Sequence, residues 1–156
     1  NAGIGSDTVQ NILWRTKRLN WSKSKPKVVV LLAGINNLAI NTPAQISNGL
    51  RQIVSEIHRN SPRTHVLLLG VFPSGKSKKH KRRGKIIALN QMIKKIGKRK
   101  RVLYRDIGDS FLMKSGHLPK YVMYDALHPT HSGYRIWAKA IRKEVTALTR
   151  IKRRRI

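Results

Sequence analysis

The chain has 156 residues, which is the length of a single domain. Its 34 Lys and Arg face only 6 Asp and Glu, a formal net charge of +28, yet a hydrophobic fraction of 40% excludes a disordered basic tail. Cysteine is absent, which excludes disulfides and a cysteine nucleophile, and the longest apolar run, Val28–Ala33, is too short to cross a bilayer.

The first predicted elements are a helix and a strand. Asp7 or Thr8 is suited to cap an opening helix, because both side chains accept hydrogen bonds from backbone N–H groups. The apolar face of this helix consists of Val9, Ile12 and Leu13. Residues 28–33 then form a continuous apolar run that ends at Gly34, a pattern typical of a parallel strand buried on both faces.

A second helix and a second strand follow. Thr42, Pro43 and Gln45 form a helix start, with a capping hydroxyl, a proline at the first position and a glutamine at the third. The apolar face of this helix consists of Ile46, Leu50, Ile53, Val54 and Ile57. Residues 66–71 contain a second apolar run, which predicts a second strand.

The rest of the chain predicts a third strand between two helices. A basic loop at 74–85 precedes a helix at 86–96, and residues 102–107 predict the strand. The inward residues of the helix are Leu89, Met92, Ile93 and Ile96. A terminal helix carries the stripe Tyr134, Ile136, Trp137, Ala140, Ile141, Val145 and Leu148. The alternation predicts an α/β fold, a parallel sheet with helices on both faces.

The excess of positive charge predicts a polyanionic partner. Nucleic acid is the first candidate and an anionic membrane the second, and we do not expect the membrane. Because the few aromatic residues lie among apolar neighbours, we expect contacts with the phosphates of RNA, rRNA first, rather than base reading. The expected RNA-binding residues are Lys76, Lys78, Lys79, Lys81, Arg82, Arg83, Lys85, Lys98, Arg99, Lys100, Arg101, Arg150, Lys152, Arg153, Arg154 and Arg155.

Three short motifs lie before helices or after strands, where open α/β sheets keep their sites. They are Asn-Ala-Gly-Ile-Gly-Ser-Asp-Thr at 1–8, Gly-Ile-Asn-Asn at 34–37 and Asp-Ala-Leu-His-Pro at 125–129. Each motif is weak alone, since a lone histidine is more often structural than catalytic. His128 and His131 lie three residues apart, but no third ligand is in reach, so we expect no metal and no cofactor.

Taken together, the motifs resemble the SGNH hydrolases, also called GDSL esterases, of the platelet-activating-factor acetylhydrolase catalytic-subunit type. The resemblance runs from Asn1 to about Val145 and includes the segments Leu-Trp-Arg at 13–15, Leu-Gly-Val-Phe-Pro at 69–73 and Gly-Tyr-Arg-Ile-Trp at 133–137. It implies a flavodoxin-like three-layer fold and a site for acyl-ester hydrolysis.

The resemblance also implies roles for four residues. His128 would be the general base, and Asp125 would orient it and stabilise its charged form. The side-chain amide of Asn36 and the backbone N–H of Ser6 would donate hydrogen bonds to the oxyanion. The family usually has glycine at the position of Ser6.

The family's nucleophile has no counterpart in the chain. In the family, a Gly-Asp-Ser motif ends the first strand, upstream of the segment that begins here at Asn1. Because the chain begins with Asn1 rather than Met, we expect that a segment upstream was removed or is not included. Without this strand, neighbouring strand edges would be exposed. Residues 108–110 also read Gly-Asp-Ser, but they follow a late strand, and we interpret Ser110 as non-catalytic.

Two functions follow from these observations. The favoured one is an RNA-binding structural protein, an inactive hydrolase-derived component of a large ribonucleoprotein such as the mitochondrial ribosome. Its partners would then include neighbouring proteins of the particle, and the four site residues would be vestigial. The alternative is an active acyl-ester hydrolase whose Gly-Asp-Ser strand lies upstream. We predict a mitochondrial location, with the cytoplasm as the alternative. We also predict a hydrolase-like domain at 1–149 and a basic tail at 150–156.

Overall fold

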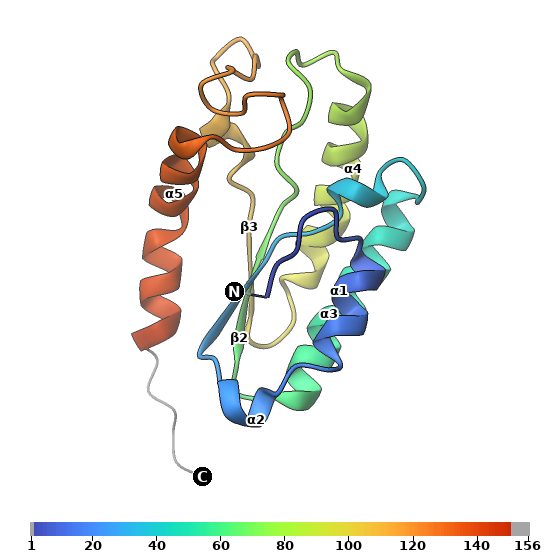
Figure 1. The fold of residues 1–156 in the computed structure, drawn as a ribbon, viewed down its shortest axis with the longest axis vertical. Helices are drawn as coiled ribbons and strands as arrows, with labels where there is room; N and C mark the ends of the chain where they lie inside the picture. The colour runs from blue at the N-terminus through green and yellow to red at the C-terminus, as the bar shows by residue number, and fades with distance from the viewer. Residues whose placement is uncertain (1, 151–156) are drawn as a thin grey trace.

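The computed structural model describes residues 2–150 of the chain. Its elements are, in chain order, α1 (Val9–Thr16), α2 (Trp21–Ser24), β1 (Val28–Leu31), η1 (Ile35–Asn37), α3 (Pro43–Asn60), β2 (His65–Leu69), α4 (Lys81–Ile96), β3 (Val102–Arg105), η2 (Gly108–Phe111) and α5 (His131–Arg150). Figure 1 shows three layers, with the strands between α5 on one side and α1, α3 and α4 on the other.

The sheet has the strand order β1-β2-β3, and both strand pairs run parallel. Its register pairs Val29 with Val66 and Leu67 with Leu103. The predicted α/β fold with a parallel sheet and helices on both faces is therefore confirmed. Because parallel strands point the same way, the loops that follow them meet at one edge of the sheet (Figure 1).

All three strands end two residues earlier than predicted, at Leu31, Leu69 and Arg105. The backbone N–H of Gly70 still donates to the carbonyl of Arg105 in β3, and from Val71 onward a side chain replaces the neighbouring strand as hydrogen-bond partner. The backbone N–H of Val71 donates to Oδ1 of Asn90 at 2.8 Å, and its carbonyl accepts from Nδ2 of Asn90 at 3.0 Å. The strand ends thus separate from one another and lead into loops at the carboxyl edge.

Two apolar clusters fill the space on either side of the sheet. In the first, α3 contributes the fully buried Ile46, Leu50 and Ile53, which pack with α1 and α4. The second lies under α5, where the rings of Phe72 and Trp137 pack edge to face with their centroids 4.8 Å apart. The sheet is therefore covered on both faces, as its apolar strands require.

The helix starts show which capping predictions hold. Thr8, and not Asp7, caps α1, with Asn11 completing the reciprocal pair of hydrogen bonds. Asp7 instead forms an ion pair with Arg15. The predicted start of α3 is confirmed, because the hydroxyl of Thr42 accepts from the backbone N–H of Gln45. Local side-chain chemistry therefore sets where both helices begin.

Three local predictions are wrong. α4 begins at Lys81 and not at 86, because the side chain of His80 caps it by accepting from the backbone N–H of Arg82 at 3.3 Å. The basic loop is correspondingly shorter than 74–85. Met92 is 37% exposed, since it lies off the stripe by which α4 packs. Tyr134 is 56% exposed, and its ring stacks on that of Trp137 instead of entering the core.

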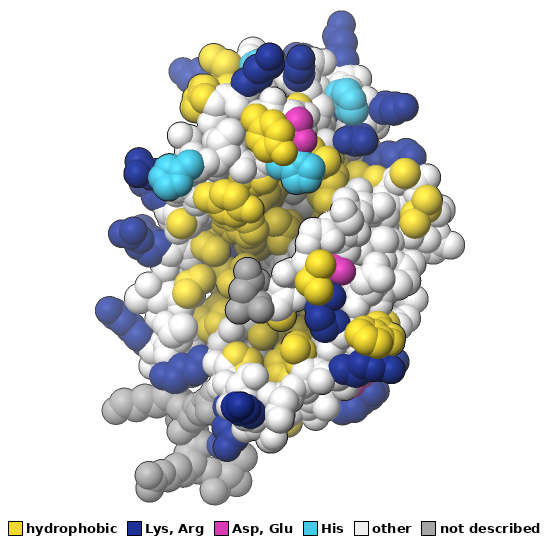
Figure 2. Space-filling view, in the orientation of Figure 1, with side chains coloured by type: hydrophobic (Ala, Val, Ile, Leu, Met, Phe, Trp, Pro, Cys, Tyr) yellow, Lys and Arg dark blue, Asp and Glu magenta, His cyan; other side chains and the backbone are white. Residues whose placement is uncertain are grey.

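β1 forms one edge of the sheet although its sequence is typical of a central strand. Val30 is 41% exposed at this edge. Figure 2 shows hydrophobic side chains gathered in a hollow between α5 and the helices of the opposite layer. Within residues 2–150, an apolar strand edge is thus open to solvent, as expected where the family's first strand does not pair with it.

None of the described helices has the length and low polarity that a membrane crossing needs. Of the basic tail predicted at 150–156, only Arg150 belongs to the described residues, and it ends α5. Lys152, Arg153, Arg154 and Arg155 lie outside them.

Candidate active site

The loop before α5 brings Asp125 and His128 together. Oδ1 of Asp125 accepts hydrogen bonds from the backbone N–H groups of Leu127 at 3.0 Å and of His128 at 2.7 Å. Ala126 takes the left-handed conformation, with φ at 62°, which reverses the chain over few residues. Oδ2 of Asp125 consequently lies 2.7 Å from Nδ1 of His128.

The charge of Asp125 determines which ring nitrogen of the neutral imidazole carries the hydrogen. The backbone N–H of His128 and further hydrogen bonds from His128 and Leu127 lower the pKa of Asp125 to about 2. The carboxylate is therefore charged at neutral pH and can only accept, so Nδ1 of His128 carries the hydrogen. In the neutral ring this leaves Nε2 as an acceptor, which is the arrangement of a general base.

The pair is open to solvent and lies beside an aromatic ring. The His128 side chain is 63% exposed and that of Asp125 is 38% exposed. The ring of Tyr124 stacks on the imidazole with centroids 6.0 Å apart. Our sequence reasoning did not single out Tyr124, although its position next to Asp125 was a signal. Residues 2–150 contain no group of three His or acidic side chains arranged to hold a metal, at His131 or elsewhere.

The two predicted oxyanion donors lie on neighbouring turns. Asn36, in η1 just after β1, donates from Nδ2 to the carbonyl of Asp7 at 2.9 Å. Since Nδ2 carries two hydrogens, one remains for a ligand. Ser6 has φ at 61°, a conformation that glycine adopts without strain. Within the described part of the chain, the backbone N–H of Ser6 has no hydrogen-bond partner.

The second asparagine of the motif has a structural role. Asn37 is fully buried, and its Oδ1 accepts from the backbone N–H of Val9 at 2.9 Å. Its Nδ2 donates to the side-chain oxygens of Gln10 and Asn41, both at 2.8 Å. Asn37 therefore fastens η1 to α1, whereas the neighbouring Asn36 is exposed and available for chemistry.

Ser110 lies in η2 and is exposed. Among the residues that the structure describes, no hydrogen bond connects its hydroxyl to His128. Within residues 2–150, no hydrogen bond connects Asn36 or Ser6 to the Asp125–His128 pair either. The segments that carry the two donors and the pair nevertheless lie at the same carboxyl edge of the sheet (Figure 1). The structure thus holds an imidazole paired with a carboxylate and, on other loops, two N–H groups that could donate to a ligand. The assignments of Asp125, His128, Asn36 and Ser6 to catalytic roles stay predictions.

Three of the cations predicted to bind RNA phosphates bind the protein itself. Arg83 is buried, with 7% of its surface exposed, and donates to backbone carbonyls. Nζ of Lys85 donates to the carbonyl of Leu38 at 3.2 Å, and Nη1 of Arg99 donates to Oγ of Ser55 at 3.0 Å. The remaining described cations of the set are mostly exposed: Lys76, Lys78, Lys79, Lys81, Arg82, Lys98, Lys100, Arg101 and Arg150.

A parallel α/β sheet with an Asp–His pair in the loop before its last helix is the arrangement of SGNH-type esterases. Residues 1–136 match the sequence model of the GDSL-like lipase/acylhydrolase family, and the chain belongs to that family. The resemblance that the sequence motifs indicated is therefore confirmed.

Curated relatives and solved structures agree with this assignment. The chain is 36% identical over 135 residues to platelet-activating factor acetylhydrolase IB subunit alpha2 of Rattus norvegicus, and 35% identical to the Homo sapiens protein of the same name. Each alignment covers 86% of this chain and 58% of the relative, so the chain spans somewhat more than half their length.

The solved structures share the fold at low sequence identity. A GDSL-like lipase from Bacteroides thetaiotaomicron superposes with a TM-score of 0.79 at 21% identity, covering 93% of this chain and 74% of that one. An acetylxylan esterase from Geobacillus stearothermophilus gives a TM-score of 0.76 at 21% identity, covering 93% and 70%.

The favoured function from the sequence, an RNA-binding structural component of a ribonucleoprotein, is wrong. The family and the relatives and structural neighbours described above are acylhydrolases and esterases, which contradicts an RNA-binding structural role. Net charge misled because it counts cations without showing which of them fasten the fold internally, as Arg83 does. The RNA partner predicted from that charge, and the mitochondrial location expected with a ribosomal function, were not tested by these findings.

Proposed function

We propose that the chain contributes the general base, its orienting carboxylate and two oxyanion donors to an acyl-ester hydrolase. The observation that carries the proposal is the 2.7 Å contact between Nδ1 of His128 and Oδ2 of Asp125. It supports hydrolysis because the charged carboxylate fixes the tautomer in which Nε2 can take a proton. The acetylhydrolase and esterase names of its relatives and neighbours support the same reaction class.

The nucleophile in this proposal is a serine on a strand outside the described residues, which pairs with the free edge of β1. The exposed, apolar edge at Val30 supports this placement, because such an edge offers unpaired backbone groups to an added strand. The carboxyl end of a strand added in parallel to β1 reaches the edge of the sheet where Asn36 and His128 lie.

The mechanism divides the reaction into two steps. The serine hydroxyl attacks the acyl carbon while Nε2 of His128 takes its proton, and Asp125 stabilises the imidazolium. Nδ2 of Asn36 and the backbone N–H of Ser6 donate to the oxyanion. His128 then gives the proton to the departing alcohol, and water releases the acyl group from the serine by the same route.

The test uses the natural polypeptide with p-nitrophenyl acetate and a fluorophosphonate probe. His128→Ala should lower kcat about a hundredfold or more, as loss of a general base does, whereas Ser110→Ala should not change it. Mass mapping should locate the probe on a serine outside residues 2–150. Absence of hydrolysis by the natural polypeptide would contradict the function, and a probe on Ser110 would contradict the placement of the nucleophile.

A further inference from the structure

Two exposed segments lie side by side at the carboxyl edge of the sheet, near the turn of Asp125. The first, 74–82, leads into α4, and the second, 112–124, follows η2 (Figure 1). The backbone N–H of Leu118 in the second segment donates to the carbonyl of Lys76 in the first at 2.9 Å. The two segments therefore form one continuous surface, which we call the two-loop face.

Internal contacts hold the two-loop face in place. Arg83 is buried, and its Nη2 donates to the carbonyl of Gly75 at 2.8 Å and to that of Gly116 at 3.4 Å, so it joins both segments. A Cβ at Gly116 would lie 3.1 Å from Cβ of Lys78, which shows how closely the segments pack. The backbone N–H of Gly75 also donates to the carbonyl of Ala126 at 2.9 Å. The face consequently has a fixed position relative to the candidate active site.

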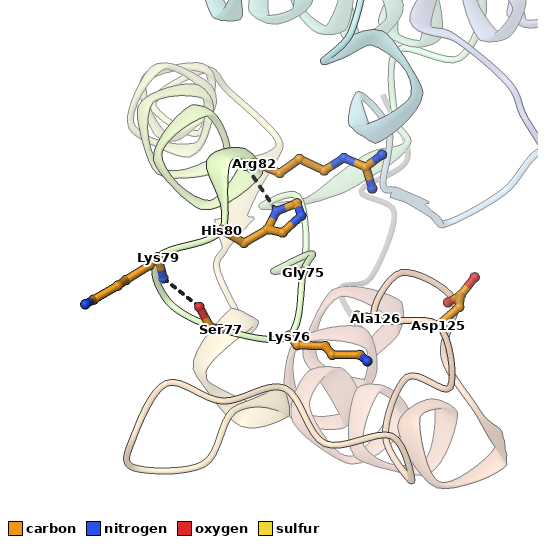
Figure 3. A pocket seen from close by; sticks show the side chains of 8 residues that line it. All are labelled: Gly75, Lys76, Ser77, Lys79, His80, Arg82, Asp125 and Ala126. Atoms are coloured by element: carbon orange, nitrogen blue, oxygen red, sulfur yellow. Dashed lines mark hydrogen bonds between the residues drawn. The ribbon is translucent and has the colours of Figure 1, made fainter.

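The two-loop face is strongly basic. The first segment contains five Lys and Arg, the second contains two, and neither contains Asp or Glu. All seven basic residues are exposed, and none belongs to an ion pair among the described residues. Figure 3 shows the first segment beside the turn of Asp125, with Lys76 and Lys79 extending from it in opposite directions. The seven residues are Lys76, Lys78, Lys79, Lys81, Arg82, Lys114 and Lys120.

Apolar and aromatic side chains lie among these cations. Met113, Tyr121 and Tyr124 are each more than half exposed. Figure 2 shows hydrophobic and basic side chains next to one another at this end of the molecule, at the top of the view. A tyrosine has an apolar ring and a polar tip, which suits it to the boundary between water and hydrocarbon. The face thus combines unpaired positive charge with apolar groups that lack a partner in the fold.

We propose that the two-loop face docks on the surface of an anionic phospholipid bilayer, with Met113 and Tyr121 among the headgroups. Clustered Lys and Arg are attracted to the negative surface of a bilayer, and apolar side chains inserted beside them strengthen the contact. RNA phosphates match the same charge but offer no apolar layer for the exposed side chains. Composition alone favoured nucleic acid because it does not show which side chains share a face.

This inference goes beyond the proposed function, because docking requires no hydrolysis. Its consequence is geometric. The turn of Asp125 lies next to the two-loop face, so docking fixes the orientation of the candidate active site relative to the bilayer, whatever ester it hydrolyses.

Vesicles of ether-linked lipids test the docking, because they contain no acyl ester. The natural polypeptide is mixed with vesicles of ether-linked phosphatidylcholine, with or without ether-linked phosphatidylserine, and bound protein is measured by flotation. It should bind the anionic vesicles and not the neutral ones, and less at higher salt. Lys78→Gln/Lys114→Gln/Lys120→Gln should weaken binding roughly a hundredfold, since each lysine near an anionic surface contributes about fivefold.

Matched controls separate this face from the rest of the surface. Lys94→Gln/Lys95→Gln/Lys98→Gln removes the same charge from exposed positions at the other end of α4 and should change the affinity by about threefold at most. Met113→Ser should weaken binding about fivefold through loss of apolar burial. Ile87→Ser, which removes a similarly exposed residue on the side of α4, should not.

A fluorescent label tests the orientation. None of the 156 residues is a cysteine, so Met113→Cys takes a thiol-reactive, polarity-sensitive dye at one position once any cysteine outside them is replaced. Its emission should shift to the blue on anionic vesicles, whereas the same dye on Ile87→Cys should show no shift. Equal shifts at both positions would contradict docking through the two-loop face.

Three binding results would overturn the inference. Wild-type affinity in the Lys78/Lys114/Lys120 variant would exclude the face, and an equal loss in its lysine control would mean attraction by net charge only. Tighter binding to an RNA oligonucleotide than to anionic vesicles, lost in the same variant, would make the face an RNA surface. Should the triple variant fold poorly, Lys114→Gln alone should still weaken vesicle binding more than Lys94→Gln does. Absence of ester hydrolysis would contradict the proposed function and leave docking to be decided by flotation.

Discussion

Replacing Arg83 with methionine is expected to destabilise the protein and to loosen the loop at 74–80. Arg83 is 7% exposed, and its guanidinium donates to the carbonyls of Ser74 at 3.0 Å and Gly75 at 2.8 Å, with a longer contact of 3.4 Å to the carbonyl of Gly116. Methionine fills a similar space but has no donor, so these carbonyls would lose their partner.

The magnitude follows from the two short hydrogen bonds. Bonds to a charged donor contribute roughly 1.5–3 kcal/mol each, which gives a gross loss of about 3–6 kcal/mol. Part of this is recovered, because burial lowers the pKa of Arg83 and therefore already disfavours its charged form. The freed carbonyls can also reach water once the loop opens. We expect a net decrease in the free energy of unfolding of about 1.5–3 kcal/mol.

Urea unfolding followed by circular dichroism measures this change, with Arg82→Met as the control. Arg82 is exposed, so its replacement should alter the free energy of unfolding by only about 0.5 kcal/mol or less. Hydrogen exchange gives the local readout at the N–H groups of Gly75 and Leu118, which bond to the carbonyls of Ala126 and Lys76. Equal stability of the two variants, or full protection of these amides in Arg83→Met, would refute the reasoning.

The remaining predictions each concern the replacement of a single residue. Asn37→Ala should lower the free energy of unfolding by about 2–3 kcal/mol because a buried N–H loses its acceptor, whereas Asn36→Ala should instead lower kcat about a hundredfold. In a polypeptide limited to residues 1–156, Val30→Lys should reduce self-association in sedimentation velocity, since it places charge on the apolar edge that the proposed nucleophile strand would otherwise cover. Because the pKa of Asp125 is lowered to about 2, its charge stabilises the fold above about pH 4, and this contribution is lost as the pH falls toward 2. Chemical unfolding at about pH 4 and about pH 2 should show a smaller decrease in the free energy of unfolding for Asp125→Asn than for the natural protein.

The parts of the fold that depend on local patterns were predictable from the sequence. The strands near 28, 66 and 102 and the cap at Thr42 follow from residues that are adjacent in the chain. The start of α4 was missed because a run of Lys and Arg looks like a solvated loop, although both residues are good helix formers. Charge alone does not show that one member of the run, Arg83, is buried and donates to backbone carbonyls.

The candidate site likewise has one part that the sequence predicts and one part that it does not. The Asp125–His128 contact spans three residues, so the sequence motif contains it whole. The loop at 74–80 is joined to the turn of Asp125 by the hydrogen bond between Gly75 and Ala126, which are distant in the chain. No local pattern predicts such a pairing, because it results from how the loops at the carboxyl edge pack against one another.

The few acidic residues of this basic chain show why the Asp125–His128 pair is best explained by chemistry. Within the described residues, the other ion-paired acids hold arginines: Asp7 with Arg15, Glu56 with Arg59, and Glu144 with Arg105. Asp125 holds a histidine that is 63% exposed, and exposed pairs contribute only about 0–1 kcal/mol to stability. Oδ1 alone already closes the turn, through the backbone of Leu127 and His128. The contact from Oδ2 therefore adds little to folding, and what it does add is a fixed imidazole whose Nε2 is ready to take a proton.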